Sequence, residues 1–382
     1  MSRKVVTVRR VGAVKAIKGA DKIELAIVDG WNCIVKKGQF DEGGLGVFFE
    51  IDSFLPATDP RWTFLEKNFI DWNHRRGFRV KSMKMKGQIS QGLLDSLDTF
   101  PEITTVLSDL EGKHGKQEAE ALIRAMSFED VLNVVKWEVV NNTAEWTNKT
   151  VTIPIPFPFF INRTDQERVQ NLPNVFDGWK DGIFQETTKM DGSSMTAYFL
   201  RQGSEKIGLL PELDTETKRI ALLPNGRFGV CSRNTDLRES DANGRWFWEV
   251  TKKYNLPAKL SGLNRNIALQ GELCGSSVQS NFEGFPQGVH DFFLFSIWDI
   301  DEQKYIKPKE VEVMARQLEI KHVPVTGYFR LGDIATTVDG LLARAEGKGL
   351  YGKKREGIVL KEVGGDFSFK AISNSYLLKH GE

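Results

Sequence analysis

The chain has 382 residues, of which 40% are hydrophobic and 27% are charged, and its net charge is +1. The length favours two domains, and the composition excludes a chain that is disordered throughout. The near-neutral charge excludes a protein that is basic over its whole surface. Binding of a nucleic acid would therefore have to use local basic patches.

The cysteines, histidines and N-terminus restrict the class further. Cys33, Cys231 and Cys274 are far apart and odd in number, which argues against a disulfide framework and for a reducing compartment. No histidine lies at metal-ligand spacing from a cysteine, so we expect no structural zinc site. No signal core or membrane-spanning run is present. We therefore expect an intracellular protein, cytoplasmic or nuclear, that does not bind membranes.

The first part of the chain, residues 4–95, has the pattern of a small β-barrel or sandwich, because short apolar or alternating stretches are separated by glycines. We expect strands over residues 5–7, 23–28, 31–35, 46–51 and 79–84. If the last strand is regular, Ser82, Lys84 and Lys86 lie on one face. With Arg75 and Arg76 nearby, this face could bind a phosphate backbone or simply face solvent.

A predicted helix and a predicted linker separate the two halves. Residues 116–135 have a helical pattern, with Ser127 and Asp130 as a capping pair. Residues 151–160 include three prolines, which exclude a central strand and favour an extended segment. We therefore expect a first domain over 1–136, a linker over 137–160 and a second domain over 161–382.

The second domain has the alternating pattern of a mixed α/β fold with a substantial sheet. We expect helices over residues 245–254 and 309–317. We expect strands over residues 182–186, 194–199, 228–232, 267–273, 292–299, 357–361 and 368–372.

Lys189 is a candidate nucleophile in the turn Lys189-Met190-Asp191-Gly192, which follows an apolar strand. A lysine must lose its proton before it attacks, and its ordinary pKa is far above neutral. It therefore needs a desolvated site or a nearby cation. Gly192 permits an unusual backbone or the close approach of a ligand. Taken alone, the motif is also consistent with an ordinary surface turn.

Two acids at predicted strand ends could hold a divalent cation beside this lysine. Glu272 follows an apolar stretch, and Glu356 lies between a basic loop and the next strand. Carboxylates bind Mg²⁺ or Mn²⁺ directly or through water, and such a cation favours a neutral amine and neutralises phosphate charge. Either acid alone is also consistent with a solvated residue or an ion pair.

Several later residues are suited to a nucleotide. Lys370 lies within an apolar strand, where its charge needs a phosphate or a carboxylate as partner. Arg233 and Lys361 are similar candidates. Phe295 could stack on a purine, although an aromatic residue in this strand could equally belong to the core.

In this order, the motifs resemble those of the covalent nucleotidyltransferases, a superfamily that includes ATP-dependent ligases and mRNA-capping guanylyltransferases. One motif is weak evidence, but an ordered series is specific. The series consists of Lys189-Met190-Asp191-Gly192, Cys231-Ser232-Arg233-Asn234, Gly271-Glu272-Leu273, residues 292–297, residues 356–361 and Phe369-Lys370.

A narrower resemblance comes from the N-terminal half. Residues 19–30, 35–38, 49–55 and 86–92 resemble an N-terminal OB domain, and residues 157–170 resemble the segment that leads into a ligase domain. This order is similar to that of ATP-dependent RNA ligases with an N-terminal OB domain. The fold it implies is α+β: an OB-type β-barrel, then a mixed α/β nucleotidyltransferase domain with antiparallel sheets. We expect no downstream OB domain, because the chain ends twelve residues after Lys370. This expectation counts against a DNA ligase or a capping enzyme.

The resemblance implies a role for each candidate residue. Lys189 would be the nucleophile, with Asp191 and Lys370 as further catalytic residues. Asp191, Glu272 and Glu356 would hold Mg²⁺ or Mn²⁺. The residues implied in binding ATP are Glu186, Lys189, Arg168, Arg233, Phe295, Lys361 and Lys370. Two positions depart from the family pattern: Thr188 replaces a common glutamate, and Ile372 replaces a common second lysine. Residues 139–150 match no part of the family.

The implied reaction seals 3′-hydroxyl and 5′-phosphate ends of RNA through lysyl-AMP and an adenylylated 5′ end. We expect a monomer that acts on RNA, with a nicked duplex carrying an RNA 3′-hydroxyl strand as one possible substrate. A DNA ligase, a guanylyltransferase and an inactive ligase-like protein that binds nucleic acid are the alternatives.

Overall fold

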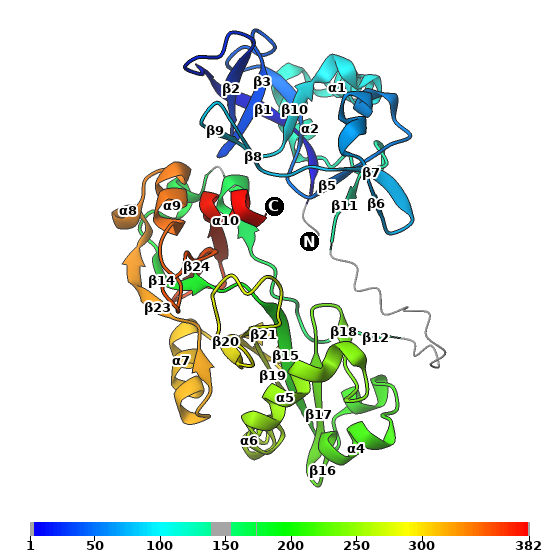
Figure 1. Ribbon diagram of the computed structural model, residues 1–382, viewed down its shortest axis with the longest axis vertical. Coiled ribbons are helices and arrows are strands. Elements are labelled where there is room, and N and C mark those ends of the chain that lie inside the picture. Colours follow the sequence, from blue (N-terminus) through cyan, green and yellow to red (C-terminus); the bar gives the residue numbers. More distant parts are fainter. Residues whose placement is uncertain (1–3, 139–153, 173, 381–382) are drawn as a thin grey trace. The chain divides into compact units, whose positions relative to one another are not determined.

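The computed structural model describes residues 4–138, 154–172 and 174–380. The chain divides into two compact units, each of which is considered by itself (Figure 1). Unit 1 comprises Met1–Asn141, Val169–Pro173 and Asn374–Glu382, and unit 2 comprises Asn142–Arg168 and Asn174–Ser373. The division after residue 141 falls within the predicted linker. Residues 139–150, which match no part of the family, lie outside the described residues.

Unit 1 is built on a curled antiparallel sheet with the strand order β10-β4-β1-β2-β3. The long strand β1 pairs with both β2 and β4, and its register to β2 shifts between Val11 and Ala13. A bulge of this kind increases the bend of a strand, which helps a small sheet to curl into a half-barrel. The predicted OB-like fold is therefore confirmed. The strands are β1 Val6–Ala16, β2 Ile23–Val28, β3 Trp31–Lys36, β4 Leu45–Phe49 and β10 Leu93–Ser96.

A second sheet, of order β11-β5-β7-β6, and the separate hairpin β8–β9 complete the strands of unit 1. The predicted strand at 79–84 is wrong, because β7 ends at Arg79 and β8 begins only at Met83. Ser82 is buried outside any strand, and Lys86 lies in the hairpin turn with φ 49°. The remaining elements are β5 Ser53–Pro56, β6 Ile70–Trp72, β7 Arg75–Arg79, β8 Met83–Met85, β9 Gln88–Ser90, β11 Val135–Lys136 and the 3₁₀ helix η1 Pro60–Asn68.

Two helices, α1 Pro101–His114 and α2 Lys116–Ala125, follow the short η2 Leu97–Thr99 and pack onto the core of unit 1. The predicted helix over 116–135 is too long, since α2 ends at Ala125, and the sequence pattern missed α1. Beyond α2, Phe128 and Leu132 are buried in non-helical backbone. The carboxylate of Glu129 holds this segment by accepting the backbone N–H of Val5. Tertiary packing therefore replaces the helix that the local pattern predicts.

Two short segments from later in the chain also belong to unit 1: η3 Val169–Asn171 and α10 Asn374–His380. The Asn171 side chain accepts hydrogen bonds from Arg9 and Trp31, each at 3.0 Å, and donates to Glu50 at 2.9 Å. These bonds explain why the structure groups Val169–Pro173 with unit 1, whereas the sequence assigned all of residues 161–382 to one domain.

Unit 2 contains a large sheet of order β12-β18-β17-β15-β19-β20-β21, with β16 added to β17 and β22 added to β20. Only β20–β22 is parallel here. The proline-containing β12 is an edge strand, as the missing N–H of proline requires. The strands are β12 Ile155–Pro156, β15 Ser193–Arg201, β16 Leu222–Leu223, β17 Gly226–Cys231, β18 Thr235–Asp236, β19 Ile267–Gly275, β20 His290–Asp299, β21 Lys304–Tyr305 and β22 Lys321–His322.

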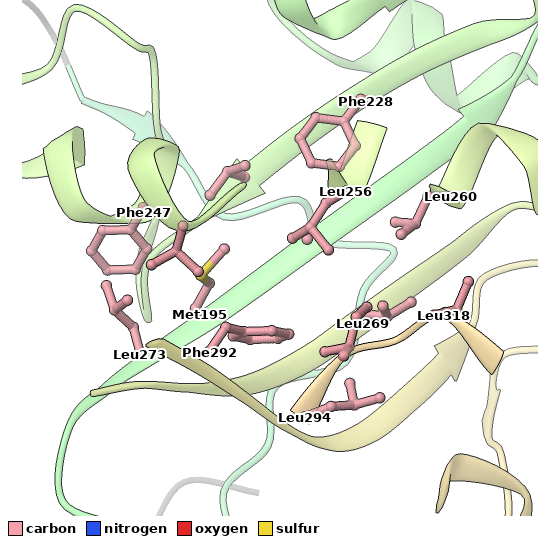
Figure 2. Packing of buried hydrophobic residues seen from close by; sticks show 14 of the residues in the cluster. Met195, Phe228, Phe247, Leu256, Leu260, Leu269, Leu273, Phe292, Leu294 and Leu318 are labelled. Atoms are coloured by element: carbon pink, nitrogen blue, oxygen red, sulfur yellow. The ribbon is translucent and has the colours of Figure 1, made fainter. Parts of the chain in front are cut away.

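One face of this sheet carries the largest hydrophobic core (Figure 2). Met195, Phe228, Leu269 and Phe292 point from four strands toward Leu256 of α6, and they are almost fully buried. The predicted helices at 245–254 and 309–317 are confirmed as α5 and α7. The helical elements of this region are η4 Glu205–Leu209, α4 Thr215–Ala221, η5 Ala242–Gly244, α5 Arg245–Lys253, α6 Leu256–Leu263 and α7 Pro308–Gln317.

The second sheet of unit 2 has the order β13-β25-β24-β14-β23, and only β13–β25 is parallel. Its strands are β13 Glu167–Arg168, β14 Ile183–Lys189, β23 Val325–Arg330, β24 Gly357–Glu362 and β25 Ser368–Ile372, and its helices are α3 Val175–Trp179, α8 Leu331–Ile334 and α9 Val338–Ala345. The α+β class is confirmed. Among the described residues, none of the helices has the length and apolar character that a membrane span requires.

Candidate active site

Lys189 is the last residue of β14, and it lies beside the start of β24 because Lys189 pairs with Gly357. Glu356 immediately precedes β24, so strand pairing brings its carboxylate to the lysine. The Lys189 Nζ lies 2.6 Å from Glu356 Oε1, with 25% of the lysine side chain and 8% of the glutamate side chain exposed. The predicted nucleophile and the predicted metal-binding acid are therefore in direct contact.

The turn after Lys189 leads directly into β15, whose pairing with β19 brings in the second predicted acid. Ser194 lies opposite Glu272 in this ladder. Gly192 fits closely here, since a Cβ at its position would lie 2.4 Å from the backbone oxygen of Leu273. The other side of the turn is fixed by Asp191, whose Oδ2 accepts the backbone N–H of Phe282 at 3.4 Å.

The carboxylates of this cluster affect one another. Burial, together with the negative charges of Glu356 and Asp191, raises the pKa of Glu272 to about 8, although Lys189 and Arg233 oppose the shift. A bound cation would stabilise neighbouring carboxylates that repel one another, because it neutralises several negative charges at once. Among the described residues, however, no three acidic, histidine or cysteine side chains come close enough together to hold a metal ion. Asp191, Glu272 and Glu356 therefore remain a predicted metal site.

Positive side chains follow one face of the second sheet. Thr187, two residues before Lys189, pairs with Val359, and Val359 pairs with Lys370. Lys370 in turn pairs with Arg168 of β13. Because side chains of paired residues lie on the same face, the register places Lys189, Lys370 and Arg168 on one side of the sheet. A row of positive side chains on one face is suited to the phosphates of a nucleotide.

Phe295 is exposed to this region by a bulge in β20. Gln270 pairs with Ser296 and Gly271 pairs with Leu294, so Phe295 is the extra residue between them. A bulge redirects a side chain, and Phe295 is only partly buried whereas Phe293 belongs to the core. Its stacking role is therefore sterically possible.

Lys361 lies next to this ring. Its Nζ is 5.2 Å from the centroid of the Phe295 ring, and it donates hydrogen bonds to the Phe295 carbonyl and to Ser296 Oγ. Burial lowers the pKa of Lys361 to about 7. A group with this pKa can gain or lose a proton near neutral pH, and a nearby phosphate would favour the charged form.

Glu186 is placed apart from the other candidates. It is three residues before Lys189, on the opposite face of β14, where Arg344 of α9 donates to one carboxylate oxygen and Thr326 Oγ1 donates to the other. Its side chain is almost fully buried in these bonds. This geometry does not favour contact between Glu186 and a nucleotide bound beside Lys189.

Both halves of the chain match models of known protein families. A family model described as RNA ligase matches residues 182–372, and one described as an OB-fold domain matches residues 5–97. The chain is similar over its full length to solved structures of an RNA ligase from Naegleria gruberi. A mutant of that protein with ATP and Mn is 38% identical, with 100% of each chain covered and a TM-score of 0.80.

Two further structures of the Naegleria gruberi RNA ligase give the same result. A mutant with AMP and Mn and a form with PPi are both 37% identical, with 99% of each chain covered and TM-scores of 0.79. No curated protein matches the chain. The chain belongs to the RNA ligase family.

In this ligase, Arg233 is carried by the short turn between β17 and β18. Its guanidinium lies 3.0 Å from Asp165 and is about half exposed. An exposed ion pair is weak, so another anion can easily replace Asp165. Below the turn, Asp236 is buried and accepts a hydrogen bond from Tyr198 at 2.7 Å. Burial raises the pKa of Asp236 to about 6, although Tyr198 and Arg227 oppose the shift.

This shift makes the stability of the ligase depend on pH. Between pH 4 and 6 the unfolded chain releases the Asp236 proton while the folded protein retains it, so the free energy of unfolding falls as pH rises through this window, by at most about 3 kcal/mol. Asp236→Asn should flatten the dependence of the free energy of unfolding on pH, since the asparagine side chain does not titrate. Its amide oxygen can still accept the Tyr198 hydrogen bond. Urea unfolding at several pH values measures it, with exposed Asp181→Asn as the control. Equal slopes for the wild type and Asp236→Asn would contradict the assignment.

One acid near the lysine was missed by the sequence analysis. Glu283, in the loop between β19 and β20, is 1% exposed, and its charge state is coupled to those of Asp191 and Lys189. Burial raises its pKa, and backbone N–H groups of Leu350 and Asp191 oppose the shift. No motif signals Glu283, because it is a single acid in a polar loop.

Proposed function

We propose that this RNA ligase takes AMP from ATP onto Lys189 and uses it to join a 3′-hydroxyl end to a 5′-phosphate end. The observation that carries the proposal is the position of Lys189. It ends a strand beside two acids, 2.6 Å from Glu356, and shares a sheet face with Lys370 and Arg168.

In the first step, the neutral Lys189 Nζ attacks the α-phosphorus of ATP. A bond forms between nitrogen and phosphorus, the bond to the bridging oxygen of pyrophosphate breaks, and lysyl-AMP remains. Lys370 and Lys361 stabilise the charge on the α-phosphate, and Arg168 supports the departing pyrophosphate. Glu356 accepts the Nζ proton in this proposal, which is supported by its contact with Nζ before the reaction.

In the next steps, a 5′-phosphate oxygen attacks the lysyl-AMP phosphorus and releases Lys189, and the 3′-hydroxyl oxygen then attacks the activated 5′-phosphate and releases AMP. Arg233 binds the nucleotide or the phosphate end in this proposal. Its half-exposed guanidinium, close enough to Glu272 to lower the pKa of that acid, supports the assignment. In each step the protein acts mainly by positioning groups and by stabilising charge.

A divalent cation, Mg²⁺ or Mn²⁺, would be held by Asp191, Glu272 and Glu356, directly or through water. When bound, it supplies positive charge to the phosphate oxygens and lowers the cost of a neutral Lys189. For the base, we propose that adenine stacks on Phe295. We do not include Glu186 in the nucleotide site, because Arg344 and Thr326 occupy its carboxylate.

Covalent labelling tests the proposal. The ligase is incubated with α-³²P-ATP and Mg²⁺ or Mn²⁺, and the labelled protein is separated under denaturing conditions. We expect a labelled band for the wild type and none for Lys189→Ala. No band with ATP, or a band that persists in Lys189→Ala, would contradict the proposal. Label from GTP alone would favour a guanylyltransferase, and binding of nucleic acid without label would favour an inactive ligase-like protein.

We propose RNA as the substrate, including nicked duplexes that carry an RNA 3′-hydroxyl strand, and a monomer acting inside the cell. Only contacts to the 2′-hydroxyl distinguish RNA from DNA. Sealing of nicked duplexes with RNA or DNA on each side of the nick tests the first point. Light scattering tests the second, with the mass of a dimer as the contradicting result.

The hairpin β8–β9 is a basic surface for this substrate. Lys84 and Lys86 are exposed on it, and its base is fixed to the sheet by Ser90 Oγ, which accepts the backbone N–H of Ile34 at 2.9 Å. Lys84→Ala with Lys86→Ala should reduce the slope of log affinity against log salt by about 2, one for each phosphate contact. Filter binding of nicked RNA at several salt concentrations measures it. Lys113→Ala on α1 is the exposed control, and an unchanged slope in the double variant would exclude the hairpin.

A further inference from the structure

The loop of residues 276–289, between β19 and β20, contacts the nucleophile turn through two successive residues. The backbone N–H of Phe282 donates to Asp191 Oδ2 at 3.4 Å. The next residue, Glu283, is close enough to the turn for the backbone N–H of Asp191 to lower the pKa of the Glu283 carboxyl. Asp191 is thus held both by its side chain and by its backbone, as a helix end is held by a capping box.

The same carboxylate also contacts the segment that leads to Glu356. Glu283 Oε2 accepts the backbone N–H of Leu350 at 3.2 Å. This contact requires glycine at position 349, because a Cβ there would lie 2.3 Å from Oε2. Nearby, the rings of Phe285 and Tyr351 pack edge to face, with their centroids 4.7 Å apart. The loop therefore joins the two segments that carry the proposed nucleophile and its acid partner.

Burial of the Glu283 carboxylate would be unfavourable if this residue served only to fill space. Only 1% of it is exposed, and Oε1 has no hydrogen-bond partner among the described residues. A buried polar atom without a partner lowers the stability of the fold. An apolar side chain would pack better at a buried position with only a structural role. The presence of a carboxylate here is therefore best explained by the backbone N–H groups that it contacts.

We infer that Glu283 is a positioning residue for lysine adenylylation: its carboxylate holds the Lys189–Gly192 turn in register with the segment before Glu356. It acts through Asp191 and the backbone of Leu350, not on ATP itself. The inference rests on the proposed role of Lys189 as nucleophile. Displacement of a reacting group by about 1 Å can slow a reaction about 100-fold, so a loss of this support should be measurable.

Four variants test the inference by single-turnover labelling with ATP. Glu283→Ala removes the acceptor, and Glu283→Gln keeps one acceptor oxygen but no charge. Gly349→Ala leaves Glu283 intact and displaces it from Leu350. Gly262→Ala, on α6, is the control, because a Cβ there meets nothing within 4 Å.

At saturating ATP, we expect Glu283→Ala to be slower by about 10- to 100-fold, with the KM for ATP within about threefold of the wild type. Glu283→Gln should recover most of the rate, and Gly349→Ala should fall between the two. Gly262→Ala should match the wild type. Thermal unfolding of each variant separates a loss of rate from a loss of folded protein.

Three results would overturn the inference: a wild-type rate for Glu283→Ala, equal loss in Glu283→Gln and Glu283→Ala, or a changed KM without a changed rate. If Glu283→Ala does not fold, Gly349→Ala decides, and a wild-type rate there counts against the inference. Failure of the wild type to label at Lys189 is a different result, since it removes the proposed function itself.

Discussion

Glu356→Ala should slow the adenylylation of Lys189 by about 100- to 1,000-fold, the cost typical of removing one electrostatic group from an active site. Glu356 is the acid in direct contact with Lys189, at 2.6 Å, and it is 8% exposed. Its loss removes both the proposed proton acceptor and one carboxylate of the metal site. Single-turnover labelling with α-³²P-ATP, over a range of Mn²⁺ concentrations, measures the effect.

Glu356→Gln separates the two roles of this acid. The amide oxygen of glutamine can still bind a metal or its water, but it cannot accept a proton from Lys189. We expect this variant to be slow as well, with less dependence on Mn²⁺ than Glu356→Ala. Glu319→Gln, at an exposed position in the same unit, is the matched control. A rate for Glu356→Ala within threefold of the wild type would exclude Glu356 from the first step.

The proximity of candidate residues could be predicted best where they lie at strand ends. Lys189 ends β14, and Glu356 precedes β24. Pairing of these two strands is sufficient to bring them together, since the ladder sets Lys189 against Gly357. Strand ranges and residue types can both be read from a sequence, so this part of the site follows once the pairing partner is known.

Strand alternation also explains why Glu186 is a weak candidate. Residues separated by an odd number of positions lie on opposite faces of a strand, and Glu186 is three positions before Lys189. The structure places it under α9 beside Arg344. This conclusion was within reach of the sequence, whereas the partner on α9 was not.

Features that depend on long-range packing could not be predicted. The bulge that exposes Phe295 is visible only when β20 is aligned with β19. The role inferred for Glu283 depends on Leu350, 67 residues later in the chain. In unit 1, the predicted helix over 116–135 ends early because Phe128 and Leu132 pack into the core as non-helical segments. Local patterns contain no information on such contacts.

Gly192→Ala should slow adenylylation by about 100-fold or more, although it adds only one methyl group. A Cβ at position 192 would lie 2.4 Å from the backbone oxygen of Leu273 and 2.9 Å from Cγ of Glu272. A backbone oxygen within a paired strand cannot yield as a flexible side chain can. The turn must therefore move away from β19, which carries Lys189 away from Glu272. We also expect the free energy of unfolding to fall by about 1–3 kcal/mol.

The two effects of Gly192→Ala can be measured separately. Urea unfolding gives the loss of stability, and labelling well below the unfolding transition gives the loss of rate in folded protein. Gly364→Ala, in the turn between β24 and β25, is the matched control, because a Cβ there meets nothing within 4 Å. If Gly192→Ala is destabilised but labels at the wild-type rate, the turn tolerates displacement and the separation of Lys189 from Glu272 is not critical. If both properties are lost, the close packing of this turn on β19 is what places the nucleophile among its acids.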